Sequence, residues 1–85
     1  MKTYPIYKTI KKSYVKGISI KLIKMEYNYF DKDLQKQKEG TVYYIEMNGG
    51  DIDTIKIYFD NNEKNMYNFY NDFKNITKKY VDFII

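Results

Sequence analysis

The sequence has 85 residues, of which 44% are hydrophobic and 31% are charged, with a formal net charge of +4; this length fills one hydrophobic core, so we expect a single domain over residues 1–85. It contains no cysteine and no histidine, which excludes disulfides, zinc–thiolate sites and thiol nucleophiles and removes the commonest metal ligand and general base. The charge is uneven, because residues 1–24 hold seven lysines and no acidic residue, whereas residues 25–60 hold four lysines and eight acidic residues.

The first predicted strand is weak. Residues 4–10 alternate only loosely between apolar and polar side chains. Pro5 restricts them to an edge strand or to the start of a strand, because proline cannot donate to a hydrogen-bonded ladder. The polar run at residues 11–13 then predicts a turn.

A long strand is predicted over residues 14–29. Its apolar residues share one face as far as Leu22, but from Ile23 onward they fall on the other face. A β-bulge near Leu22 and Ile23 would return both sets to one face. The alternative is a strand that is covered on both faces.

Two more strands and a tight turn follow. Residues 31–40 are almost entirely polar and predict an exposed hairpin loop that could include one helical turn. Strands are predicted over residues 41–47 and 54–59. Between them, residues 48–51 (Asn-Gly-Gly-Asp) predict a hairpin turn, since glycine readily adopts the positive φ angles that such turns need.

The C-terminal helix has the clearest pattern. Residues 60–63 (Asp-Asn-Asn-Glu) predict its N-cap, with Glu63 placed for a capping box. Residues 81–85 fit either a short terminal strand or a continuation of the helix through Ile84. The apolar stripe with helical spacing consists of Met66, Phe69, Tyr70, Phe73, Ile76 and Tyr80.

These elements predict an α+β fold, a small two-layer domain in which a three- to four-stranded antiparallel β-meander packs on one C-terminal α-helix. A helix of ~19 residues and a strand of ~8 residues have similar lengths, so one helix can cover one face of the sheet. The residues expected on the uncovered face are Val42, Tyr44 and Tyr58. The tyrosines expected in the core are Tyr27, Tyr70 and Tyr80.

Carboxylates beside turns are the only candidates for metal binding or acid–base chemistry. Asp51 and Asp53 flank the Gly-Gly turn, but they lack the further ligands that an EF-hand supplies, so turn chemistry explains them better. Lysines neutralise Asp31 and Asp33, and no glycine-rich phosphate loop occurs. Because two thin layers leave little room for a catalytic pocket, we expect no enzyme, no cofactor and no metal.

The basic N-terminal third is the best candidate for a binding surface. Its lysines would attract phosphates or acidic proteins, and its tyrosines would stack on bases or fill a protein interface. The absence of arginine argues against base-specific readout. A structural alternative is an edge strand that lysines keep unpaired. The residues predicted to contact a protein or nucleic acid are Tyr7, Lys8, Lys11, Lys12, Tyr14, Lys16, Lys21 and Tyr58.

Nothing at the N-terminus predicts secretion, because lysines interrupt any apolar signal region, and no apolar run approaches the ~20 residues of a membrane span. We expect a cytoplasmic protein, or one in the host cytoplasm if a phage encodes it. The short length, the missing histidine and cysteine and the bias to Tyr, Lys, Asn and Ile resemble small accessory proteins of phages and mobile elements. Anti-CRISPR and other anti-defence inhibitors belong to that group. No motif carries the resemblance to a particular residue, and an AT-rich genome would produce the same bias.

Two functions follow as hypotheses. The first is a non-enzymatic binding module that binds and inhibits or modulates a larger protein, plausibly nucleic-acid-handling machinery. In one version, Asp31, Asp33, Asp51 and Asp53 stand in for phosphates. The alternative is weakly sequence-specific binding of DNA or RNA through the Lys/Tyr-rich N-terminal strands. A homodimer through the N-terminal edge strand or the bare sheet face is also possible.

Overall fold

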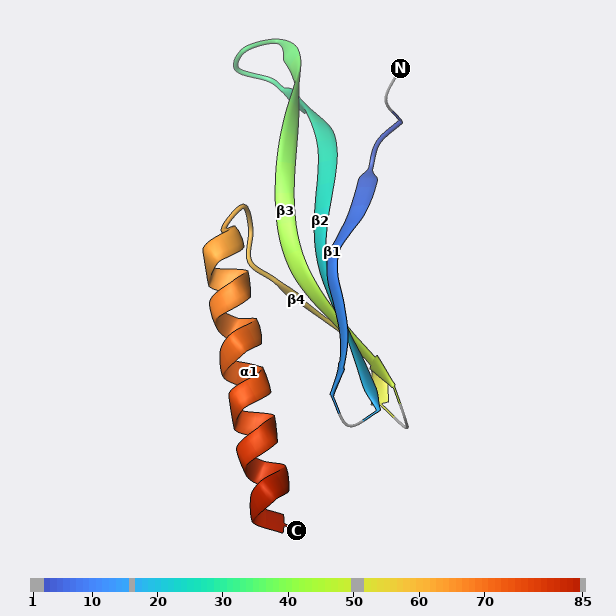
Figure 1. The fold of residues 1–85 in the computed structure, drawn as a ribbon. Coiled ribbons are helices and arrows are strands. Elements are labelled where there is room, and N and C mark those ends of the chain that lie inside the picture. Colours follow the sequence, from blue (N-terminus) through green and yellow to red (C-terminus); the bar gives the residue numbers. More distant parts are fainter. Residues whose placement is uncertain (1–2, 16, 50–51, 85) are drawn as a thin grey trace.

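A computed structural model of the chain describes residues 3–15, 17–49 and 52–84, and the side chains of all of these except 52 and 76–84. Within these residues the chain forms one four-stranded antiparallel sheet, in the order β1-β2-β3-β4, and one helix. The helix lies along one side of the sheet (Figure 1), which confirms the predicted α+β meander with a C-terminal helix. The elements are β1 (Ile6–Val15), β2 (Ile18–Asp31), β3 (Lys36–Gly49), β4 (Ile52–Tyr58) and α1 (Glu63–Ile84).

The first strand is longer than predicted. β1 starts directly after Pro5 and lies at the edge of the sheet, as expected, but it continues through residues 11–13. The turn predicted there is wrong, because the backbone stays paired with β2, while Lys12 points to the face away from the helix and Lys11 and Ser13 contact Tyr70 of the helix. The chain reverses instead at Gly17, whose φ of +81° suits a residue without a Cβ.

Both faces of β2 are covered at Leu22 and Ile23, which are only 0% and 7% exposed although they point in opposite directions. β2 pairs with β3 along its length without a register shift. The shift lies in β1 between Thr9 and Lys11, which leaves Ile10 as an extra residue opposite this pair. The bulge predicted in β2 is therefore wrong, and the alternative of coverage on both faces holds at Leu22 and Ile23 but not along the whole strand, since Tyr27 and Tyr29 are exposed.

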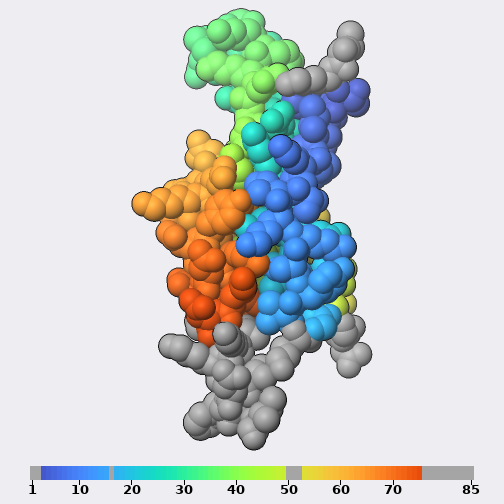
Figure 2. Space-filling model, in the orientation of Figure 1, coloured from blue at the N-terminus to red at the C-terminus, as the bar shows by residue number. Residues whose placement is uncertain are grey.

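β2 and β3 extend beyond their neighbours as a hairpin arm, residues 27–40. The loop predicted over residues 31–40 is wrong in extent, because β3 already begins at Lys36. The arm projects past β1 and the helix (Figures 1 and 2), and the molecule is 59 Å long. Polar side chains suit residues 36–40 of β3 because both faces of the arm lie largely in solvent.

Both turns that flank β3 rely on local chemistry. Before it, Asp31 Oδ1 accepts the N–H groups of the second and third residues that follow, at 3.0 and 3.1 Å. After it, Gly49 has a φ of +150° and β4 starts at Ile52, which agrees with the connection predicted at residues 48–51. Gly50 and Asp51 lie outside the described residues.

The start of α1 confirms the predicted N-cap region but not the capping box. Asn62 is the N-cap, because its Oδ1 accepts the N–H of Asn65 at 3.0 Å. Glu63 is the first helical residue rather than the third, so it cannot reach back to the cap. A hydrogen bond to Glu63 instead raises the pKa of Tyr43 in β3. The backbone is helical through Ile84, which decides against the terminal strand.

The core lies between α1 and the sheet. Met66 and Tyr70 are fully buried and Phe73 is half-buried, which confirms the N-terminal part of the helical stripe, whereas Phe69 is 37% exposed. The hydroxyl of Tyr70 hydrogen-bonds to Ser13 Oγ at 2.8 Å, so its polar end is satisfied. The fully buried side chains are Ile20, Leu22, Ile45, Met66 and Tyr70.

Two other tyrosine predictions have different outcomes. Tyr27 was expected in the core and is 37% exposed, because by alternation from Ile23 it lies on the sheet face opposite the helix, in the hairpin arm. Tyr80 lies among the residues whose side chains are not described.

Candidate functional site

The sheet face opposite the helix brings together five of the eight residues predicted to bind a partner. Cross-strand pairing places Lys12 opposite Lys21, Tyr14 opposite Ser19, and Tyr44 opposite Tyr58. Directly opposed residues share a face, and side chains alternate between faces along each strand. We name this surface the tyrosine–lysine face, and define it by Tyr7, Lys12, Tyr14, Lys21 and Tyr58.

Three of these residues expose most of an aromatic ring. Tyr7, Tyr14 and Tyr58 are 59%, 66% and 57% exposed, although each belongs to a paired strand. Exposed rings of this size on one face are typical of a binding surface rather than a core. The two edge strands supply them, so they flank the centre of the sheet on both sides.

Two buried side chains, Tyr44 and Ile23, lie at the centre of this face. Tyr44 is only 4% exposed and its ring centroid lies 5.1 Å from that of Tyr58, in a tilted arrangement. Ile23 lies beside Tyr44 in the adjacent strand. Burial raises the pKa of Tyr44, so its hydroxyl stays protonated at neutral pH. The expectation that Tyr44 and Tyr58 lie on the face away from the helix is confirmed, and the buried ring of Tyr44 packs against the exposed ring of Tyr58.

The lysines of this face are poorly neutralised. Lys12 and Lys21 oppose each other across the ladder, and like charges so placed destabilise a sheet. Glu46 lies opposite Lys21 on its other side, but its carboxylate contacts Lys56 at 4.0 Å. Within the described part of the chain, no carboxylate forms an ion pair with Lys12 or Lys21. Lys12 Nζ lies 5.5 Å from the centroid of the Tyr14 ring, which is a cation–π contact between these two exposed side chains.

The remaining predicted lysines lie elsewhere. Lys8 and Lys11 belong to the helix side of β1, and Lys16 lies outside the described residues. Lys11 and Lys74 each place their Nζ 5.1 Å from the centroid of the Tyr70 ring. Burial raises the pKa of Tyr70, but the Ser13 hydrogen bond and these two cations outweigh it, so the pKa is lowered overall. Lys11 therefore packs over a core residue and is not part of the exposed face.

The acidic residues do not form one surface. Asp31 and Asp33 lie at the tip of the hairpin arm, at the end of β2 and in the turn that follows, whereas Asp53 lies in β4 at the other end of the sheet. Asp31 is occupied by the turn and by Lys38, whose Nζ lies 3.3 Å away. Asp51 lies outside the described residues. In the described ranges no three carboxylates gather as a metal site would require. The structure therefore gives no support to an acidic surface that imitates phosphates.

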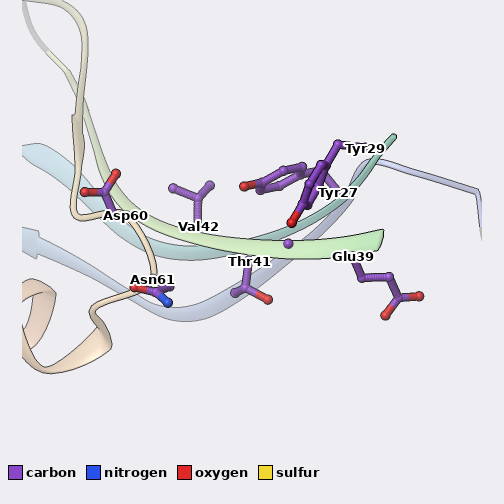
Figure 3. A pocket seen from close by; sticks show the side chains of 8 residues that line it. Tyr27, Tyr29, Glu39, Thr41, Val42, Asp60 and Asn61 are labelled. Carbon is purple, nitrogen blue, oxygen red and sulfur yellow. The ribbon is translucent and has the colours of Figure 1, made fainter. Parts of the chain in front are cut away.

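A groove that the sequence did not indicate lies at the outer edge of β3. It encloses about 480 Å³ and contains the neighbouring rings of Tyr27 and Tyr29, whose centroids are 6.0 Å apart. Figure 3 shows both rings, Val42 and Asp60 on one side of β3, with Thr41, Glu39 and Asn61 on the other. The Tyr27 ring lies over Gly40, where a Cβ would fall 2.4 Å from its Cζ. The only sequence feature that could have pointed to this groove is the alternation of tyrosine with a polar residue at residues 27–29, together with the glycine that pairs with this segment.

No described helix is long and apolar enough to cross a membrane. Comparison with protein-family models, with curated proteins and with solved structures gives no match.

Proposed function

We propose that this chain is a non-enzymatic binding module that binds single-stranded DNA or RNA, with weak sequence specificity, through its tyrosine–lysine face. One observation carries the proposal: three exposed tyrosine rings share a sheet face without a helix with Lys12 and Lys21, which form no ion pair within the described part of the chain. Such a module would act in the cytoplasm of the encoding cell or of its host.

The chemistry of the face suits a single strand better than a duplex. Bases in a single strand expose their flat surfaces, which stack on aromatic side chains, whereas duplex bases are already stacked. The lysines supply point charges for the phosphates, and the chain as a whole carries +4. Because every base offers a stacking surface and the chain contains no arginine, the expected specificity is weak.

The first experiment is a fluorescence-anisotropy titration with labelled 15-nucleotide oligo(dT) and oligo(U), repeated at 50 and 200 mM salt. Each phosphate that is contacted should weaken binding ~2.6-fold across this range, from a slope of about −0.7 for single strands. A duplex of equal length should bind more weakly. The absence of binding to both oligonucleotides at 50 mM salt would refute the proposal.

Tyr58 allows a test of stacking that leaves the charge unchanged. Tyr58→Leu removes the ring and should lower affinity by roughly 5- to 150-fold, which corresponds to ~1–3 kcal/mol per stacked base. Tyr58→Phe keeps the ring and should retain most of the affinity. Equal losses in the two variants would point to the hydroxyl, and so contradict stacking.

A second candidate is a protein partner, and the exposed rings of Tyr27 and Tyr29 favour it. These rings extend the aromatic surface onto the hairpin arm, and tyrosine is enriched at the centres of protein interfaces. In this reading the chain would inhibit or modulate nucleic-acid-handling machinery, as anti-CRISPR proteins do.

Photo-crosslinking separates the two candidates. With p-benzoylphenylalanine in place of Tyr58, a crosslinked adduct formed in cells and removed by nuclease supports nucleic acid. A nuclease-resistant adduct of one discrete mass supports the protein partner and counts against the first candidate.

A further inference from the structure

The outer edge of β3 is unpaired along the hairpin arm. β4 leaves the sheet beside Tyr43, where the Tyr43 N–H donates to the Asp60 carbonyl at 2.7 Å and the Phe59 N–H donates to the Tyr43 carbonyl at 2.9 Å. Asp60 then takes a φ of +50° and leads into the helix. Residues 36–42 therefore have β2 on one side and no strand of the described chain on the other.

The free backbone groups follow from the alternation of an antiparallel ladder. Because the N–H and C=O of Tyr43 face β4, those of Thr41, Glu39 and Gln37 face the open edge, and the residues between them bond to β2. Each of the three offers one donor and one acceptor. An extended edge of this kind is a template for another strand.

Charged side chains normally block pairing at such an edge. At this edge, the two charged side chains nearest the centre are held by contacts with other parts of the chain. Lys38 reaches back to Asp31 in β2, with 3.3 Å between Nζ and Oδ2. Glu39 accepts a hydrogen bond from the hydroxyl of Tyr4, which comes from the β1 side of the sheet. Gly40, which follows them, has no side chain. The two charges nearest the centre of the edge therefore do not shield it.

We propose that a second copy of this chain pairs with the open edge, strand β3 against strand β3 in antiparallel orientation, with the two-fold axis at Glu39. In this register residues 36–42 of one copy meet residues 42–36 of the other, so the whole open segment is used. Gln37 faces Thr41 of the second copy, and every outward-facing backbone group finds a partner. This is an isologous interface, as a closed dimer requires.

Charge complementarity favours a second copy as the occupant. Lys36 would lie opposite Val42 of the second copy and beside Asp60, which lines the same groove. Within the described residues no carboxylate forms an ion pair with Lys36. The one like-charge contact is Glu39 with itself, and each of these carboxylates already bonds to its own Tyr4.

The dimer would also have a consequence for binding. A two-fold axis perpendicular to the sheet keeps the same face of both copies on the same side. The two sheets would form one continuous sheet, with both tyrosine–lysine faces on one surface and both helices on the other. The inference goes beyond the proposed function and does not depend on it, because the dimer is measured without nucleic acid.

Sedimentation equilibrium of the free protein over ~5–500 µM tests the inference with two proline variants. Thr41→Pro removes an N–H from the open edge and leaves the bonds to β2 intact, since proline is tolerated where the N–H points outward. Asn28→Pro is the matched control, because its N–H points to the opposite edge of the arm, beyond the end of β1. We expect a reversible dimer for the wild type and the control, and at least ~10-fold weaker dimerisation for Thr41→Pro.

Amide hydrogen exchange supplies a second readout at the level of single residues. In the wild type, protection of the amides of Gln37, Glu39 and Thr41 should rise with protein concentration, while that of Val42 stays high throughout. A wild type that remains monomeric at 500 µM would overturn the inference, even if the edge accepts a foreign peptide. The inference would also be overturned if the Thr41→Pro variant still dimerised and if, in the wild type, the amides of Gln37, Glu39 and Thr41 exchanged freely at every concentration.

Discussion

The β1–β2 ladder contains a matched pair of sites for separating stability from binding. Lys12 lies opposite Lys21 on the tyrosine–lysine face, and Lys8 lies opposite Lys24 on the helix side of the same ladder. Both β1 lysines are exposed and both face a lysine. Replacing either by threonine removes one charge and one like-charge contact, so the two variants differ mainly in which face they alter.

Stability should rise in both variants. Directly opposed like charges cost a few tenths to ~1 kcal/mol, and threonine is a better strand residue than lysine. The gain at Lys8 should be the smaller one, because Lys24 Nζ already lies 3.5 Å from Glu26 Oε1, which reduces the repulsion. Urea denaturation followed by circular dichroism measures both changes.

Binding should fall only in the Lys12→Thr variant. If Lys12 contacts one phosphate, and if the electrostatic contribution vanishes at 1 M salt, the loss is ~8-fold at 50 mM salt and ~3-fold at 200 mM. The slope of log affinity against log salt should fall by about 0.7 in Lys12→Thr and stay nearly constant in Lys8→Thr. Equal losses of affinity would mean that only net charge matters, and would refute the assignment of the binding face.

Three further predictions concern the fold. Met66→Ala should lower the free energy of unfolding by ~2–5 kcal/mol in urea denaturation, because it empties a fully buried site between helix and sheet. Gly49→Ala should destabilise more than Gly17→Ala, because the new Cβ would meet the Gly17 carbonyl oxygen at 2.5 Å, whereas nothing lies within 4 Å of a Cβ at Gly17. A hydrogen bond to Glu39 raises the pKa of Tyr4 from 10.0 to about 12, so its stabilising effect should be present below pH 10.0 and lost as the pH rises through about 12. Ultraviolet titration should show this late tyrosine, and Glu39→Gln should return its pKa toward the ordinary range; an unchanged titration curve would contradict the contact.

The elements that depend on local periodicity were predictable from the sequence. The helix was found because its apolar residues recur every three to four positions, and its N-cap because Asn62 precedes that stripe. The turn after β3 was found because glycines mark it. The polar strand segments at residues 11–13 and 36–40 were missed. Their pairing comes from backbone hydrogen bonds to a neighbour, and side-chain polarity does not report those bonds.

The composition of the tyrosine–lysine face depends on one residue that periodicity could not locate. The adjacent apolar residues Leu22 and Ile23 indicated a change of phase, but the extra residue is Ile10 in the partner strand. That insertion reverses the alternation of β1, so Tyr7 rather than Lys8 shares a face with Lys12. Which lysines act together is therefore decided by the register between two strands, and neither strand encodes that register alone.

The two proposed surfaces have separate origins: the single helix leaves one face uncovered, and the unequal lengths of the four strands leave an edge unpaired. β2 and β3 have 14 residues each, whereas β1 has 10 and β4 has 7. One helix can cover only one face, so Tyr7, Tyr14 and Tyr58 remain exposed on the other. The excess length of β3 also leaves backbone groups unpaired at the arm, where no strand of the described chain reaches them. A ladder that only had to close a core would end where its neighbours end, so we infer that the arm and the bare face exist to meet something else.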